Sequence, residues 1–119
     1  MLTAILYPLI AKAIEKPVEA PVEPPKPIVD PTLERIAFCE SQGDLFARNP
    51  RSSAKGKYQF LDGTWKYYGQ RLWGDSWVEK DVFSEKDQDD LATFVVSVNG
   101  YRDWEADPTS VACWKSKTQ

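Results

Sequence analysis

The sequence contains no histidine, and this absence removes several kinds of active site. There can be no Ser/His/Asp triad, no Cys/His nucleophile and no His-ligated zinc or haem. Only two cysteines occur among the 119 residues, and without histidine they cannot complete a metal site. If the protein is an enzyme, its acid and base chemistry must come from a carboxylate, Lys, Tyr or Cys.

A surplus of basic side chains is also missing. Fifteen Lys and Arg stand against eighteen Asp and Glu, which gives a net charge of −3. General nucleic-acid binding needs a basic face, so we expect no nucleic-acid partner. The charge is unevenly placed, because residues 32–73 carry seven basic and four acidic side chains, whereas residues 74–119 carry five and ten.

No apolar run reaches the roughly 20 residues that a typical transmembrane helix needs. Residues 1–14 begin with the uncharged run MLTAILYPLIA, which lacks the basic flank of a secretion signal. Three interpretations remain open for this segment. It is a truncated or atypical secretion signal or membrane anchor, a misassigned start, or an interfacial or docking helix.

Proline marks the domain boundary. Seven of the nine prolines lie in the first 31 residues, and residues 15–30 form a Pro/Val/Glu tract with little apolar bulk. Such a tract predicts an extended, polyproline-like linker. We therefore expect one small globular domain over residues 31–116, followed by a short tail at 117–119.

Helix start and stop signals predict a mostly helical domain. Asp30-Pro31 is a typical cap and first position for a helix that ends near Gly43. Other helices are predicted from Asp62 to Gly69, from Ser84 to Asn99-Gly100, and from Asp107-Pro108 to about Trp114, with Asp62 and Ser84 as caps and a short strand at Lys57–Leu61. The fold class is α+β, mostly helical, with one short strand or hairpin.

Glu40 is the candidate acid. It follows Leu33, Ile36 and Ala37 at helical spacing, so it lies at the end of an apolar helix face. Desolvation on such a face raises the pKa of a carboxyl, and a Glu that stays protonated near neutral pH can act as a general acid. The alternative is a helix-end Glu that faces water.

Short motifs follow Glu40 in a definite order. They are Cys39-Glu40-Ser41-Gln42-Gly43-Asp44, Gly56-Lys57-Tyr58-Gln59-Phe60, Thr64-Trp65, Asn99-Gly100-Tyr101, Trp104 and Cys113. Together they resemble the lysozyme-like core of the resuscitation-promoting factors, also called the transglycosylase-like domain. The resemblance covers about residues 32–114 and implies a small lysozyme-like fold.

The resemblance also implies roles. Glu40 would be the catalytic acid, and Thr64, Gln59 and Asn99 would contact the sugar chain. It implies a Cys39–Cys113 disulfide, where the residues alone leave two free buried thiols as an alternative. The sequence departs from the family pattern at four positions, with Gln42 and Lys57 for Gly, Asp44 for Asn and Asn99 for Gln. These departures concern the sugar contacts and leave the acid in place.

Aromatic residues are frequent in the domain, with all five Trp after residue 64. Most should form the core of so small a domain. One or two could instead form a platform for sugar rings, and Trp65 and Tyr58 are the candidates because they adjoin the implied groove.

The reaction depends on a second carboxylate. Residues 45–61 contain no Asp or Glu, although Asp44 and Asp62 flank this gap. A site with one carboxylate favours a lytic transglycosylase that forms a 1,6-anhydro sugar over hydrolysis, which uses two carboxylates. A non-catalytic glycan-binding or signalling domain and a virion-associated lysin are the rival interpretations.

The resemblance implies a peptidoglycan-cleaving glycosidase that acts on the bond between N-acetylmuramic acid and N-acetylglucosamine. A disulfide implies an oxidising compartment, so we expect a secreted or membrane-tethered protein at the cell wall. We expect no cofactor and no metal, glycan strands as the partner, and a monomer. The basic first half of the domain suits an anionic wall polymer.

Overall fold

The computed structural model describes residues 29–116. The expectations for residues 1–14, for most of the linker at 15–30 and for the tail at 117–119 lie outside the described residues. Within them the chain forms helices α2 (Pro31–Ser41), α3 (Asp62–Trp73), α4 (Glu85–Asn99) and α5 (Pro108–Lys115), and the 3-10 helices η2 (Gly74–Glu79) and η3 (Arg102–Trp104). The predicted mostly helical fold is confirmed.

Three helix starts follow the expected capping chemistry. The Asp30, Ser84 and Asp107 side chains accept hydrogen bonds from backbone N–H groups in the first turns of α2, α4 and α5. Each side-chain oxygen satisfies a donor that the helix leaves without a partner. These caps fix where α2 and α5 begin, and the last turn of α2 and the first turn of α5 lie side by side at Glu40.

Other boundaries differ from the prediction. Asp62 is the first residue of α3 rather than its cap, and the helix runs past Gly69 to Trp73. Helix α2 ends at Ser41, and its C-cap is Gln42, which has a left-handed φ of 59°, one residue before Gly43 with φ 81°. The cap at Gln42 shows that a non-glycine residue can take this conformation when it ends a helix.

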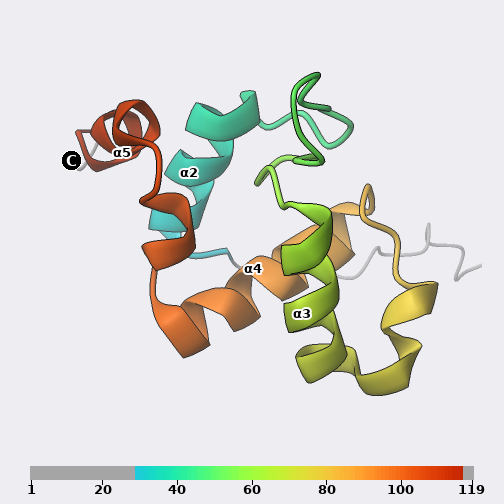
Figure 1. Ribbon diagram of the computed structural model, residues 1–119. Helices are drawn as coiled ribbons and strands as arrows, with labels where there is room; N and C mark the ends of the chain where they lie inside the picture. The colour runs from blue at the N-terminus through green and yellow to red at the C-terminus, as the bar shows by residue number, and fades with distance from the viewer. Residues whose placement is uncertain (1–28, 117–119) are drawn as a thin grey trace, which may run out of the picture.

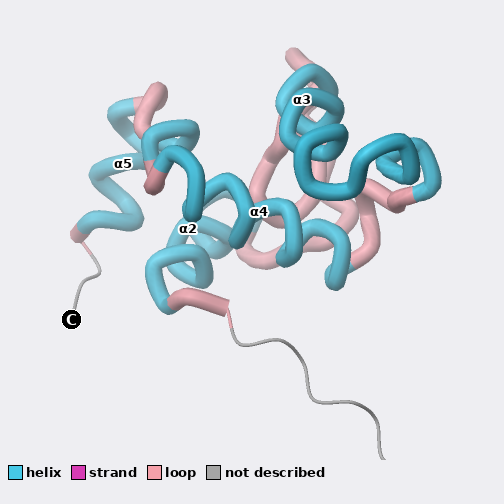
Figure 2. Tube along the Cα trace, turned by 90° about the horizontal axis from the view of Figure 1, so that it is seen from below, coloured by secondary structure: helices cyan, strands magenta, loops and turns pink. Residues whose placement is uncertain are grey.

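The predicted strand at Lys57–Leu61 is replaced by a tight turn. Among the described residues the only β-type pairings are two isolated antiparallel bridges, Arg48 with Lys55 and Lys55 with Phe60. The chain reverses between Lys55 and Phe60 because Gly56 and Gln59 both have left-handed backbones, with φ 84° and 58°. Figure 2 shows this part of the chain as a loop between helices.

Helices α2 and α4 lie in the middle of the domain. Helix α5 packs on α2 at one end, and α3 packs on α4 at the other, as Figures 1 and 2 both show. The core between them combines aliphatic side chains of α2 and α4 with rings from the loop and from the later helices. Its members are Leu33, Ile36, Ala37, Tyr58, Phe60, Trp65, Tyr68, Leu91, Ala92, Val95, Trp104 and Trp114.

The two cysteines form a disulfide that ties α2 to α5. Cys39 and Cys113 lie 74 positions apart in the sequence, and their Cα atoms are 6.0 Å apart. The pairing implied by the resemblance is therefore present. Because Cys39 directly precedes Glu40, the cross-link fixes α5 beside the candidate acid.

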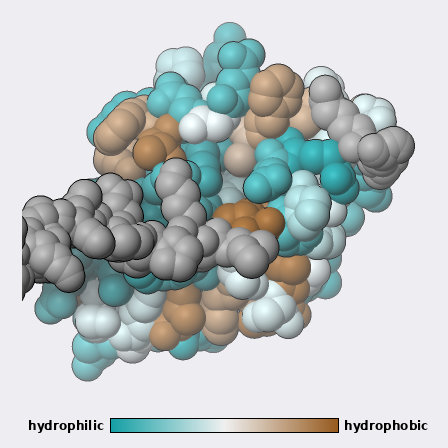
Figure 3. All heavy atoms as spheres, turned by 180° about the vertical axis from the view of Figure 1, so that it is seen from behind, coloured by the Kyte–Doolittle hydropathy of each residue, from teal (hydrophilic) through white to brown (hydrophobic). Residues whose placement is uncertain are grey.

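Among residues 29–116 the exposed large apolar side chains are Phe38, Phe46, Leu61, Tyr67, Val78 and Val98. On the face in Figure 3, brown and teal residues alternate over the part of the surface that described residues form. Within residues 29–116, none of the helices combines the length and the apolar character needed to cross a bilayer.

Candidate functional site

Glu40 lines a pocket of about 530 Å³. Its side chain is half-buried on the last turn of α2, beyond the buried residues Leu33, Ile36 and Ala37 of the same helix face. The remaining walls come from the turn before α3, from α3 itself, and from η3 and the residues between it and α5. The pocket thus joins segments far apart in the sequence around one carboxyl group.

Three influences act on the Glu40 carboxyl. Burial raises its pKa above the ordinary value and is the largest effect. The Ser110 hydroxyl donates a hydrogen bond to Oε2 at 2.5 Å, which lowers the pKa, and the negative charge of Asp107 raises it. The net result is a raised pKa, which is the condition for a carboxyl to donate a proton at higher pH than an exposed Glu can.

Two of the predicted sugar contacts, Gln59 and Thr64, line the same pocket as Glu40. Gln59 belongs to the tight turn, and its Nε2 donates to the Gly56 carbonyl at 2.9 Å. Thr64 is in the first turn of α3. The structure therefore brings together the acid and two groups that can form hydrogen bonds with a ligand.

Asn99 is near the pocket but does not line it. Its Nδ2 donates to the Tyr68 hydroxyl, and its Oδ1 accepts from Arg102 Nη2 at 3.0 Å. Tyr68 and Arg102 both line the pocket. In this structure Asn99 reaches the pocket through these two neighbours, which differs from the direct contact that we expected.

The two predicted platform residues are part of the core. Tyr58 is fully buried, with its hydroxyl donating to Asp89 Oδ1 at 2.6 Å. Trp65 is 6% exposed, and its ring packs against Phe60 and Trp73 at centroid distances of 5.9 and 5.5 Å. Neither ring has a free face for a sugar, so this expectation was wrong. A small domain needs its large rings to fill the core.

Tyr67 is the exposed aromatic residue of the pocket wall, and the sequence analysis missed it. Its side chain is 50% exposed, and the Arg71 guanidinium lies 3.6 Å from its ring centroid. Helical spacing could have found it. Residues three apart on a helix share a face, so Thr64 and Tyr67 lie on the same side of α3.

The acidic residues near Glu40 also differ from the expected pair. Asp44 accepts a backbone hydrogen bond from Phe46 and Asp62 pairs with Lys55, and neither lines the pocket. Asp103, Asp107 and Arg102 do line it. With Glu40, these three make the charged lining mainly acidic, so the basic first half of the domain does not set the charge of this pocket.

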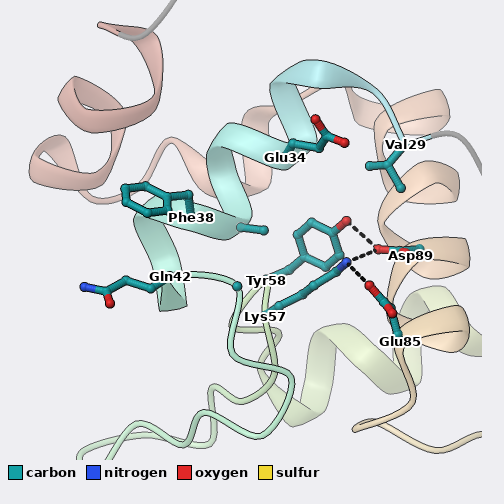
Figure 4. A pocket seen from close by; sticks show the side chains of 10 residues that line it. Val29, Glu34, Phe38, Gln42, Lys57, Tyr58, Glu85 and Asp89 are labelled. Atoms are coloured by element: carbon teal, nitrogen blue, oxygen red, sulfur yellow. Dashed lines mark hydrogen bonds and ion pairs between the residues drawn. The ribbon is translucent and has the colours of Figure 1, made fainter.

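A second pocket, of about 570 Å³, lies on another side of α2. Figure 4 shows Phe38 on α2, Gln42 just after its end and Asp89 on α4, with Lys57 and Tyr58 between the two helices. Lys57 Nζ lies 2.8 Å from Asp89 and 3.3 Å from Glu85. The side chains of Lys57 and Asp89 are only 12% and 7% exposed, so this ion pair is part of the interior.

Gln88 completes the attachment of the turn to α4. Its Oε1 accepts from the Lys57 backbone N–H at 2.6 Å, and its Nε2 donates to the Leu45 carbonyl at 3.3 Å. A Cβ on Gly56 would lie 2.5 Å from Oε1 of Gln88, and the φ of 84° there also favours glycine. Lys57 and Gln88 thus hold the turn that places Gln59 in the Glu40 pocket.

Among residues 29–116 no three acidic or thiol side chains gather closely enough to hold a metal ion. The site offers instead a desolvated carboxyl, amide and hydroxyl groups, and an exposed phenol ring. Such a set can bind a polar ligand and transfer a proton to it.

Comparisons with known proteins give the family. A probable transglycosylase SceD from Staphylococcus epidermidis is 57% identical over 37 residues, which cover 31% of this chain and 17% of that protein. The probable transglycosylase SceD 2 from Staphylococcus saprophyticus is 48% identical over 48 residues, covering 35% and 19%. The chain thus aligns with less than a fifth of these relatives.

No solved structure matches the chain. The profile of the transglycosylase-like domain family matches residues 28–107, from just before α2 to the cap of α5, and leaves the body of α5 beyond the match. This range includes Glu40 and the three sugar contacts that the resemblance implies, Gln59, Thr64 and Asn99. The chain belongs to the transglycosylase-like domain family.

Proposed function

We propose that this protein is a peptidoglycan-cleaving glycosidase in which Glu40 is the general acid. The observation that carries the proposal is the Glu40 carboxyl itself, half-buried, with a raised pKa, in the wall of a pocket. The names of the SceD relatives and the family of the chain support a transglycosylase reaction on the wall polymer.

In the proposed reaction the glycan strand lies across the pocket with its β-1,4 link between N-acetylmuramic acid and N-acetylglucosamine near Glu40. Glu40 gives its proton to the glycosidic oxygen, and the C1–O bond breaks as positive charge develops on the muramic ring. The C6 hydroxyl of the same muramic residue then attacks C1, while the Glu40 carboxylate accepts the proton that this hydroxyl loses. The products are a 1,6-anhydro sugar end and a free 4-hydroxyl, with no covalent enzyme intermediate.

Other pocket residues have supporting roles in this proposal. Gln59 and Thr64 form hydrogen bonds with the sugars, and the exposed ring of Tyr67 packs against an apolar sugar face. Asn99 contributes by holding Tyr68 and Arg102 in place. The substrate places the protein at the cell wall, outside the cytoplasm.

Hydrolysis is the second candidate, and a specific observation favours it. Asp103 and Asp107 line the pocket with Glu40, so a second carboxylate is available to activate water. Digestion of purified peptidoglycan in ¹⁸O-labelled water separates the two reactions. Anhydro ends without the label support the transglycosylase reaction, and reducing ends that carry the label support hydrolysis.

The role of Glu40 is tested in the same digestion with Glu40→Gln. The matched control is Glu34→Gln, which changes the other glutamate of α2 at a position that lines the second pocket. We expect the control to digest like the unmodified protein and Glu40→Gln to release soluble fragments at least about 100-fold more slowly. Equal digestion by Glu40→Gln and the unmodified protein would overturn the proposal.

A further inference from the structure

The N-terminal turn of α5 lies against the Glu40 carboxyl. Asp107 caps this helix by accepting from the Thr109 N–H at 3.0 Å, and Ser110 is in the first turn. Asp107 also lines the pocket. This turn therefore brings the Asp107 carboxylate and the Ser110 hydroxyl close to the Glu40 side chain.

The disulfide is placed to keep this arrangement. Cys39 is the neighbour of Glu40 on α2, and Cys113 lies three positions after Ser110 on α5, which is one turn of helix. Ser110 and Glu40 are 70 positions apart in the sequence. The Cys39–Cys113 bond joins the last turn of α2 to α5. It therefore keeps α5 against α2 and holds Ser110 within hydrogen-bond distance of Glu40.

The Ser110 hydrogen bond distinguishes the two carboxyl oxygens of Glu40. A serine hydroxyl that donates its only proton to Oε2 needs a lone pair there, and Oε2 supplies one in either protonation state. This hydrogen bond is kept when Glu40 carries its proton on Oε1. The contact thus ties Oε2 to α5 and orients the carboxyl, with Oε1 as the oxygen that has no hydrogen bond to Ser110.

We propose that Ser110 and Asp107 are positioning residues for the acid step, with Ser110 orienting the Glu40 carboxyl and Asp107, the cap of α5, placing its own carboxylate in the same pocket wall. This inference rests on the proposed function of Glu40 as the general acid. It assigns a role in the reaction to a helix that otherwise appears only structural.

The two residues act on Glu40 in opposite directions. Ser110 stabilises the carboxylate and lowers the pKa of Glu40, whereas the charge of Asp107 raises it. The other charged or titratable groups of the pocket wall are Asp103, Arg102, Tyr67 and Tyr68. These groups stay unchanged in the variants below. A change in the pH dependence of cleavage is therefore caused by the substitution at Ser110 or Asp107.

The experiment uses the full chain with its disulfide intact and three variants. Ser110→Ala removes the hydroxyl, Ser110→Thr keeps it, and Asp107→Asn removes the charge but retains a good helix cap. The rate of peptidoglycan cleavage is measured against pH. In parallel, ¹³C NMR of the Glu carboxyl groups follows the titration of Glu40, assigned by its absence in Glu40→Gln.

We expect Ser110→Ala to lose about tenfold in rate, because general acid catalysis depends on the position of the proton. The alkaline limb of its pH–rate profile should move to higher pH, because the hydrogen bond that stabilises the Glu40 carboxylate is gone. Ser110→Thr should restore both the rate and the limb. Asp107→Asn should move the alkaline limb to lower pH, and the NMR titration should move in the same directions.

A loss of packing would not produce shifts of opposite sign. Identical pH profiles and Glu40 titrations in all variants would overturn the inference, as would shifts of the same sign for Ser110→Ala and Asp107→Asn. If the unmodified chain cleaves no peptidoglycan, the proposed function fails. The NMR titration still decides whether Ser110 and Asp107 control the Glu40 carboxyl.

Discussion

The disulfide gives the most quantitative prediction for stability. In the chain-entropy model, a cross-link between residues 74 positions apart restricts the unfolded chain by about 4.5 kcal/mol. Small domains are stabilised by only about 5–15 kcal/mol in total. Breaking the Cys39–Cys113 link should therefore remove a large part of the free energy of unfolding.

Urea denaturation followed by tryptophan fluorescence measures this loss, because Trp104 and Trp114 are buried in the core. The comparison is between the oxidised protein and the double variant Cys39→Ala/Cys113→Ala, which needs no reductant. We expect the free energy of unfolding to fall by about 4–5 kcal/mol. The thermal midpoint should fall by roughly 20–35 °C.

Reductant supplies the control. It should destabilise the unmodified protein as the double substitution does, and it should leave the double variant unchanged. A loss below about 1 kcal/mol in both comparisons, a small fraction of the chain-entropy value, would refute the reasoning. It would mean that the unfolded chain gains little freedom when the link is broken.

Three further predictions concern single side chains. Asp89→Asn should cost about 3–5 kcal/mol in urea denaturation because it leaves the buried Lys57 amine with an incomplete partner, whereas Asp90→Asn, in an exposed pair, should cause no measurable change. Glu40→Gln should raise stability at neutral pH relative to the unmodified protein. Because folding raises the pKa of Glu40, the protonated carboxyl contributes its full stability below the unfolded pKa of about 4.5, and this contribution is lost as pH rises through the folded pKa. Gln resembles the protonated carboxyl at every pH, so the melting curves of the two proteins should converge at low pH. Tyr67→Ala should raise KM for peptidoglycan several-fold while Tyr67→Phe leaves it unchanged, and equal KM values in all three proteins would exclude the ring as a sugar contact.

Local capping chemistry predicted much of the helical frame. Asp30 and Asp107 each precede a proline, and both begin helices where this pattern places them. The strand prediction at Lys57–Leu61 failed for a tertiary reason. Gln88, from α4, accepts the backbone N–H of Lys57 and holds the turn, and nothing in the local sequence reports a partner 31 positions away.

The candidate site was predictable only in part, because part of it depends on contacts between distant segments. The apolar stripe and the resemblance identified Glu40, and the resemblance identified Gln59 and Thr64, which line its pocket. Ser110 and Asp107 were missed because their closeness to Glu40 depends on the packing of α5 against α2. Short-range patterns describe helices well, but they do not say which helices meet.

The most direct test of the account is the cleavage of purified peptidoglycan by the unmodified protein and by Glu40→Gln, measured as soluble muropeptides by mass spectrometry. The account predicts fragments with newly formed sugar ends from the unmodified protein. It predicts a loss of at least about 100-fold in Glu40→Gln, the smallest effect expected when a general acid is removed. Release of the same fragments at the same rate by both proteins would contradict it.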